Sequence, residues 1–412
     1  MLPPTLGGLT LIATAIGFMW YRGGFYYRID PIREKISASE TAWRTHKTGK
    51  GPDLNRQNVD ALYALISGLH PEFDVTWKGV SDDRNGFLKW QEFETRLGGK
   101  LDLPKELQDL NYQTTPRDQS KLADELEKHL GLLDDIRTIG LLPDQSAKGI
   151  RLRDWGMTGA SVPTRACALL CLQAESYAAK GAREAALEDL RAAMGIASHF
   201  DKIETPSLLQ ETIAILIRLN VQDVFLKHIL PVLEIPPHEL GEWEKVVAPP
   251  AASPKDFGIL LRGEWHVSLR YLMLPQMIRG DDPHEAPDPE RFIEGWTAEF
   301  KQRIDVCDSS TLSNLEARFA AVPPVTTSMS KQSRALLDVS LIGNRSWVGG
   351  WIRAQVIQAR TAAVFAHLEG KPLPMEPLTG LPFVWDASAK TLSPPADPRL
   401  VDLKIDPVHL SQ

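Results

Sequence analysis

The longest apolar run of the chain lies at its start. Residues 2–21 contain no charged side chain, and about twenty apolar residues suffice for a helix to cross a hydrocarbon layer of ~30 Å. Aromatic side chains favour the level of the lipid headgroups. Five of them lie at the end of the run or just after it: Trp20, Tyr21, Phe25, Tyr26 and Tyr27. We therefore predict a transmembrane helix and interfacial flank over residues 1–28, in contact with membrane lipid through residues 2–21.

The charges around this run bear on its processing and orientation. A cleaved signal peptide begins with a basic region, but no Lys or Arg precedes Leu2, so an uncleaved anchor is favoured over cleavage or a buried core helix. Basic residues that flank a membrane helix tend to stay in the cytoplasm. The apolar run is followed by Arg22, Arg28, Arg33 and Lys35, with the acidic residues Asp30 and Glu34 among them. We predict a single-pass inner-membrane protein whose body faces the cytoplasm, with the periplasm as the alternative.

After a polar linker at residues 29–57, the pattern becomes helical. Apolar residues recur at spacings of three and four, which places them on one face of an amphipathic helix. Two such stripes are Val59, Leu62, Leu65, Ile66 and Leu69, and then Leu122, Leu126, Leu130, Leu133 and Ile136. We predict a helical domain over residues 58–247.

The most helical block covers residues 164–233. Two alanine-rich segments meet at Lys180-Gly181, which predicts a helical hairpin, and Thr205-Pro206 is a plausible N-cap with proline at the first helical position. Residues 213–217 are apolar all round, so their helix should be buried. A β-strand there is the less favoured alternative.

Prolines at residues 249–254 mark the start of a second helical subdomain, residues 248–370. Its first helix should bury one stripe, and its last should run from Trp347 to Leu368. The stripe consists of Phe257, Leu260, Leu261, Trp265 and Leu269. Residues 371–412 form a Pro-rich tail in which residues 381–385 and 391–393 predict a small β-hairpin. The predicted fold is all-α, with one anchor helix, a multi-helix body and a C-terminal hairpin.

One hairpin of the body resembles a tetratricopeptide unit. Residues 170–194 hold an aromatic residue, a turn glycine and small residues at the spacings of that repeat: Tyr177, Gly181, Ala186, Leu190 and Ala193. Gln173 stands where the repeat has leucine, and no second copy follows at a period near 34 residues. A generic αα-hairpin is therefore favoured over a solenoid.

Composition narrows the partners and the chemistry. A net charge of -7 without a basic stripe argues against nucleic acid. The three cysteines, Cys167, Cys171 and Cys307, are too few for a disulfide framework or a four-ligand zinc site. Cys167 and Cys171 share one helical face, where plain packing is favoured over reactivity or metal binding.

The sharpest candidate for a site is a calcium loop at residues 81–92. It resembles an EF-hand loop, with Asp83 and Asn85 at ligand positions, Gly86 at the turn and Glu92 at the bidentate position. Ser81 replaces the usual first aspartate. The alternative is an acidic helix start capped by Ser81 or Asp82.

Known catalytic signatures are missing from the sequence. It contains no nucleophile elbow, phosphate-binding glycine loop, dinucleotide fingerprint or two-histidine zinc helix. Glu264-Trp265-His266 is the best local acid/base group, although a helical histidine is more often structural. An enzyme would need residues that the fold brings together, so this alternative stays open and no catalytic residue or cofactor is predicted.

Several segments resemble a family of uncharacterised membrane-anchored helical proteins found in planctomycete and verrucomicrobial bacteria. The likeness covers residues 150–233, including Arg151-Leu152-Arg153-Asp154-Trp155, and resumes at residues 376–383. There Glu376 and Leu381 replace the Asp and Lys of the family's Asp-Pro-Phe-Thr-Gly-Lys-Pro turn. The family often has a similar string at residues 82–86, which favours a helix start over calcium. The resemblance implies a bacterial, membrane-anchored architecture and says nothing about catalysis.

We therefore expect an interaction or scaffold protein at the membrane, with a protein partner. The alternatives are a calcium-binding protein using Asp83, Asn85 and Glu92, and an enzyme with a site assembled by the fold.

Overall fold

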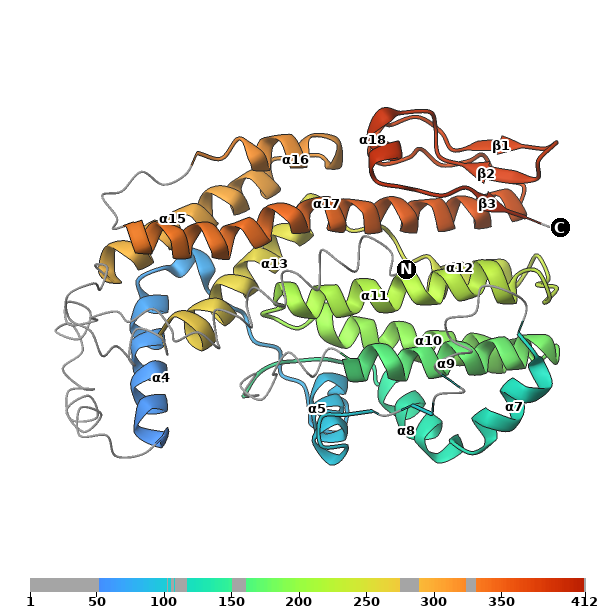
Figure 1. The fold of residues 1–412 in the computed structure, drawn as a ribbon, viewed down its shortest axis with the longest axis horizontal. Coiled ribbons are helices and arrows are strands. Elements are labelled where there is room, and N and C mark those ends of the chain that lie inside the picture. The colour runs from blue at the N-terminus through green and yellow to red at the C-terminus, as the bar shows by residue number, and fades with distance from the viewer. Residues whose placement is uncertain are drawn as a thin grey trace. The chain divides into compact units, whose positions relative to one another are not determined.

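The computed structural model describes residues 52–101, 103–104, 107, 117–149, 161–274, 289–323 and 331–410. This part is mainly helical, with thirteen α-helices and a small C-terminal sheet, and confirms the predicted all-α class (Figure 1). The predicted anchor at residues 2–21 and nearly all of the linker lie outside the described residues. Within the described ranges, no helix has the length and apolar character needed to cross a bilayer.

The chain divides into two compact units. Unit 1 comprises Met1–Thr76, Phe257–Ser309 and Glu316–Trp347, and unit 2 comprises Trp77–Asp256, Ser310–Leu315 and Val348–Gln412. The predicted helical domain at residues 58–247 thus contributes to both units. The chain leaves unit 2 after Asp256 and returns to it at Ser310–Leu315 and from Val348 onward.

Unit 1 is built around an aromatic core. Its elements are α4 (Pro52–Gly68), η2 (Pro71–Phe73), most of α13 (Pro254–Val267), the π-helix η5 (Ser268–Met273), α15 (Pro289–Asp308), part of α16 (Leu312–Ala320) and the first half of α17 (Lys331–Leu368). The ring of Trp265 stacks on Phe73 at 4.4 Å and on Trp296 at 6.0 Å. All five residues of the stripe predicted around Trp265 are buried, as expected. On α4 only Leu62 and Ile66 are buried, and Leu69 lies beyond the helix end and is exposed.

Unit 2 is a helical body centred on a hairpin. It contains α5 (Gly86–Arg96), α7 (Gln119–Glu127), α8 (Leu130–Gly140), α9 (Ser161–Ala179), α10 (Arg183–Asp201), α11 (Leu208–Val224), the π-helix η4 (Phe225–Ile229), α12 (Leu240–Val247) and the second half of α17. The predicted hairpin is confirmed as α9 and α10. Gly181 forms its turn with a φ of 74°, a left-handed conformation that suits glycine.

Three local predictions for unit 2 are wrong. The stripe from Leu122 to Ile136 is split over two helices, because α7 ends at Glu127 and α8 begins at Leu130. Leu130 itself is exposed. Helix α11 is capped by Ser207 instead of Thr205, in a capping box with Gln210. Leu216, expected to be buried, is 40% exposed.

Helices α8 and α10 approach each other at two glycines. A Cβ atom added to Gly195 would lie 1.9 Å from the carbonyl oxygen of Gly140, and one added to Gly140 would lie 2.2 Å from the carbonyl oxygen of Ala192. Both distances are far shorter than the van der Waals separation of a carbon and an oxygen atom, and the neighbouring atoms belong to the backbone. The two backbones can touch only because both positions lack a side chain.

The C-terminal module follows α17. Strands β1 (Val384–Asp386) and β2 (Thr391–Ser393) form the predicted hairpin, with Trp385 paired to Leu392. A third strand that was not predicted, β3 (Val408–His409), pairs antiparallel with β2, so the hairpin is in fact a three-stranded sheet of order β1-β2-β3. Helix α18 (Pro398–Asp402) lies between β2 and β3 in the chain.

Candidate functional site

The three predicted calcium ligands are engaged in different ways. Asn85 is buried and caps α5: its Oδ1 accepts from the Leu88 N–H at 3.3 Å and from the Ser146 N–H at 3.1 Å, while its Nδ2 donates to the Ser146 carbonyl at 2.9 Å. Glu92 is exposed on α5 and pairs with Lys89 at 2.8 Å. Asp83 is exposed, and a hydrogen bond from Ser81 lowers its pKa. The helix start is therefore capped by Asn85, and not by Ser81 or Asp82 as the alternative hypothesis had it.

No group of three or more His, Cys, Asp or Glu residues is arranged to hold a metal ion within the described ranges. Calcium binding through Asp83, Asn85 and Glu92 stays a prediction. Asn85 has a structural role, because its side-chain amide joins the start of α5 to the segment after α8.

Replacing Asn85 with alanine should lower the free energy of unfolding by about 2 kcal/mol, since one helix cap is lost and the buried Ser146 peptide groups lose their partners. Urea unfolding of the full chain, followed by circular dichroism, measures this change. Asp83→Ala is the matched control, and its unfolding midpoint should stay at the wild-type value. Equal midpoints for the two variants would contradict the capping role.

Unit 2 buries an ionic cluster around Glu175 of α9. Arg117, just before α7, donates from Nη1 to one carboxylate oxygen, and Gln119 Nε2 donates to the other at 2.8 Å. The Arg117 and Glu175 side chains are only 3% and 2% exposed. His228, brought in by the π-helix η4, has its Nδ1 3.7 Å from the same carboxylate. The cluster joins α7, α9 and η4 through one carboxylate.

A second ion pair joins α8 to the α9–α10 hairpin and buries its carboxylate, Asp189. Arg137 of α8 donates from Nε to Asp189 of α10 and from Nη2 to Gln173 of α9, both at 2.7 Å. Burial raises the pKa of Asp189 to about 6, although Arg137 opposes the shift. Gln173 thereby ties α9 to α8 through Arg137.

The charged groups of the cluster and the pair are engaged with one another. Both carboxylates are held by guanidinium groups, and burial lowers the pKa of His228. Burial also raises the pKa of the Cys167 and Cys171 thiols well above the usual range, so both stay protonated at neutral pH. Plain packing of the two cysteines is the interpretation that this environment supports.

His266, the other candidate for acid/base chemistry, is a structural residue of unit 1. Its Nε2 lies 2.6 Å from the Phe73 carbonyl oxygen and its Nδ1 2.7 Å from the Tyr63 hydroxyl. Both ring nitrogens of His266 are therefore hydrogen-bonded within the protein, and burial lowers the pKa of His266. The neighbouring Glu264 accepts a hydrogen bond from Ser268 at 2.5 Å.

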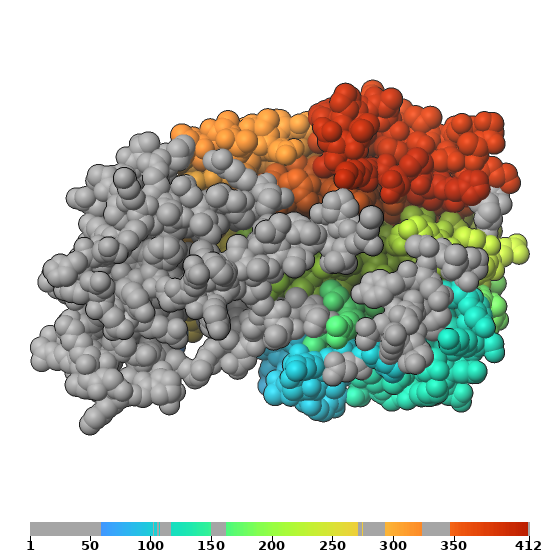
Figure 2. Space-filling view, in the orientation of Figure 1, coloured from blue at the N-terminus to red at the C-terminus, as the bar shows by residue number. Residues whose placement is uncertain are grey.

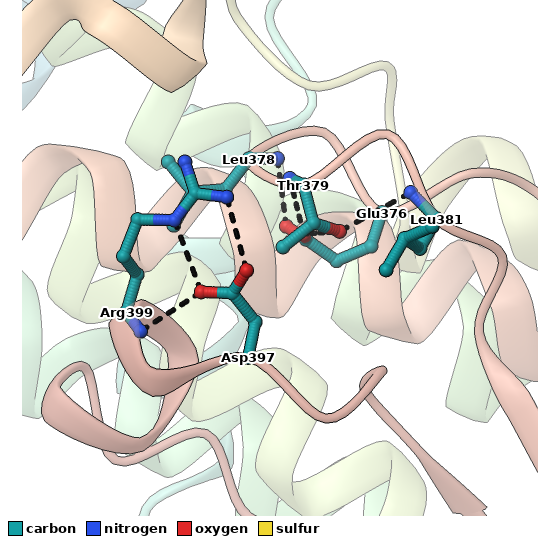
Figure 3. Close-up of polar contacts among 6 residues, drawn as sticks. All are labelled: Glu376, Leu378, Thr379, Leu381, Asp397 and Arg399. Carbon is teal, nitrogen blue, oxygen red and sulfur yellow. Dashed lines mark hydrogen bonds and ion pairs between the residues drawn. The ribbon is translucent and has the colours of Figure 1, made fainter.

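The C-terminal module is organised by a carboxylate at the position of the family-like turn. Glu376 is fully buried, and its oxygens accept from Leu378 N at 2.9 Å, Thr379 N at 2.8 Å and Thr379 Oγ1 at 2.6 Å (Figure 3). The Glu376 N–H also donates to the Leu381 carbonyl at 2.7 Å. Gly380, with a φ of 71°, closes the turn. The Glu376 carboxylate therefore holds this loop together from inside.

Other contacts fix the rest of the module. Asp397 caps α18 and binds the guanidinium of Arg399 at 3.0 Å (Figure 3). Arg353 and Arg360 of α17 donate to the carbonyls of Leu403 at 2.8 Å and Asp406 at 2.5 Å. The loop and strands are thereby held against the long helix.

This rigid module displays apolar side chains. Residues 375 and 382 form an antiparallel bridge, so Met375, Pro382 and, two residues on, Val384 share one side of the backbone, while Phe383 points to the core and is 2% exposed. Met375 is 63% and Val384 50% exposed, and Pro382 is exposed as well. We call these three residues the C-terminal apolar face. The module that carries them is coloured red in Figure 2 and lies open on the side drawn.

Sequence reasoning missed the buried ionic residues. Arg117 and Glu175 are 58 positions apart, and Arg137 and Asp189 are 52 apart, so no local spacing links them. A usable signal was nevertheless present: Gln173 and Glu175 interrupt a helix whose other residues are almost all apolar or small.

No protein family model, no curated protein and no solved structure matches the chain. The resemblance to planctomycete and verrucomicrobial proteins, and the tetratricopeptide likeness of α9 and α10, therefore stay predictions.

Proposed function

We propose that this protein is a membrane-anchored helical interaction or scaffold protein. In this proposal, residues 2–21 hold the chain in the inner membrane, the helical body faces the cytoplasm, and the body binds a protein partner. Arg22 and Arg28, directly after the apolar run, support the orientation, because basic flanks favour the cytoplasmic side.

The observation that carries the proposal is the C-terminal apolar face. Met375, Pro382 and Val384 are exposed together on a module whose backbone is fixed by Glu376 and by the arginines of α17. Exposed apolar residues that lie side by side commonly mark protein contacts, whereas single ones need no explanation. A rigid loop also loses little conformational entropy when it binds.

The interior supports the same proposal. Two buried carboxylates of unit 2 pair with arginines, Glu175 with Arg117 and Asp189 with Arg137. Such pairs fix helices in place, which suits a body that presents a surface.

Crosslinking in native membranes tests the proposal. The tagged full-length chain is crosslinked, captured and compared with a tagged chain that carries only residues 1–58. The proposal expects one or a few proteins that recur with the full chain and not with the short one. Identical capture by both chains would overturn it.

Calcium is the second candidate function, because Asp83, Asn85 and Glu92 follow the EF-hand spacing. Calorimetric titration of the full chain with calcium decides this candidate. Heat that saturates below millimolar calcium and is lost in Glu92→Gln would support it, and the absence of heat at millimolar calcium would remove it.

A further inference from the structure

A tyrosine and a histidine meet inside unit 1, although they are 203 positions apart in the chain. Helix α4 places the Tyr63 hydroxyl 2.7 Å from Nδ1 of His266, which lies near the end of α13. On its other side, the His266 ring has Nε2 2.6 Å from the carbonyl oxygen of Phe73. The fold thus brings a phenol, an imidazole and a backbone carbonyl into one hydrogen-bonded row.

The direction of both hydrogen bonds follows from the groups themselves. A carbonyl oxygen can only accept, so Nε2 of His266 carries the proton and donates to Phe73. In a neutral imidazole the other nitrogen then has a lone pair and accepts, and burial favours this neutral form, because it lowers the pKa of His266. The Tyr63 hydroxyl therefore donates to Nδ1, and the Phe73 carbonyl fixes both the tautomer and the orientation of the ring.

This row has the arrangement of an activated nucleophile. Such a site needs a hydroxyl within hydrogen-bond reach of a base, and a third group that orients the base. Tyr63 supplies the hydroxyl on a half-buried side chain, while His266, the base, is only 6% exposed. Tyr177 is half-buried as well, but its hydroxyl meets the amide of Gln173 at 3.5 Å, and an amide is no base. Tyr177 is therefore a natural comparison within the same chain.

The charges around the pair bear on its reactivity and on its substrate. The guanidinium of Arg270 lies over the Tyr63 ring, 5.1 Å from the centroid, and donates to Asp60 at 2.8 and 3.0 Å. A cation over the ring favours the phenolate, whose negative charge spreads into the ring. Asp74 acts on His266 through its charge. An anionic phosphoryl donor would be repelled by Asp60 and Asp74, whereas a neutral acyl donor would not.

We propose that Tyr63 is a reactive phenol that accepts an acyl group from an activated ester, with His266 as its general base. Tyr63 Oη attacks the acyl carbon, and the phenol proton passes to Nδ1 of His266. The bond between the acyl carbon and the leaving oxygen then breaks, and the leaving group takes the proton from Nδ1. The products are an ester of Tyr63 and the free alcohol, and no electrons are transferred. This site is independent of the C-terminal apolar face and of the proposed partner.

Acetylation by p-nitrophenyl acetate tests the proposal. The full-length chain in detergent micelles is treated with this ester, and acetylation of each tyrosine is followed by peptide mass spectrometry. Tyr63 should react about 100-fold faster than Tyr177 at neutral pH, the lower end of what a general base contributes. Its rate should level off near neutral pH, where His266 has lost its proton, while the rate of Tyr177 should rise toward the phenol pKa of about 10.

Two variants assign the roles. Tyr63→Phe removes only the hydroxyl and should abolish the fast release of p-nitrophenolate. His266→Asn should slow the acetylation of Tyr63 about 100-fold, with circular dichroism as the check on folding. If that variant unfolds, the pH profile of the wild type decides the role of the base. Equal rates for Tyr63 and Tyr177, a Tyr63 rate that rises with pH as that of Tyr177 does, or an unchanged rate in folded His266→Asn would overturn the proposal.

Discussion

Replacing Glu175 with alanine should lower the free energy of unfolding by about 3–5 kcal/mol, because the buried Arg117 guanidinium then loses its carboxylate. Glu175 also accepts a hydrogen bond from Gln119 at 2.8 Å, so α7 and the residue two positions before it both lose their link to α9. Urea unfolding of the full chain, followed by circular dichroism, measures the loss.

An exposed ion pair provides the control for this prediction. Arg96 and Asp135 pair at 2.7 Å, but their side chains are 62% and 52% exposed, so Asp135→Ala should change the free energy of unfolding by less than about 1 kcal/mol. The double variant Arg117→Met with Glu175→Leu should recover much of the loss, since two apolar side chains can replace a buried pair. A loss for Glu175→Ala as small as that for Asp135→Ala would contradict the ionic cluster.

Replacing Gly195 with alanine should lower the free energy of unfolding by about 3 kcal/mol, because the new Cβ atom would lie 1.9 Å from the Gly140 carbonyl oxygen. The backbone of α8 would have to move away from α10, and the contact between Gly140 and Ala192 would open. The gain of roughly 1 kcal/mol in helix propensity from glycine to alanine offsets only part of this loss.

Gly350 gives the matched comparison. It lies inside α17, and an added Cβ would meet nothing within 4 Å, so Gly350→Ala should leave stability unchanged or raise it by up to about 1 kcal/mol. Thermal unfolding of the two variants beside the wild type separates them. Equal melting temperatures for Gly195→Ala and Gly350→Ala would show that the two helices do not touch at Gly195.

The elements that could be predicted are those whose information is local. Alanines on both sides of Gly181 favour two helices with a turn between them, and the stripe around Trp265 follows the helical period, so both are confirmed. The β1–β2 hairpin was also visible, because a turn separates two short apolar runs. Each of these signals lies within about twenty residues.

The predictions that were wrong concern features that depend on tertiary contacts. The exposure of Leu216 reflects which helices cover α11, and the two-residue strand β3 exists only because β2 is there to pair with it. The end of α7 and the start of α8 could not be predicted, because the apolar residues keep their helical spacing across both helices.

The candidate sites divide in the same way. Asn85 was singled out from a local motif, and the structure shows the amide as a helix cap. The C-terminal apolar face could not be predicted, because the exposure of Met375 and Val384 depends on how the turn at Glu376 folds back.

Site-specific photocrosslinking from the C-terminal apolar face tests the central claim most directly. A photoreactive amino acid is placed in the full-length chain at Val384, 50% exposed, or at Val232, 60% exposed and outside that face, and both chains are irradiated in native membranes. The account predicts a discrete protein adduct from position 384 that is absent from position 232. The same adducts from both positions, or none from position 384, would contradict an interaction role for this face.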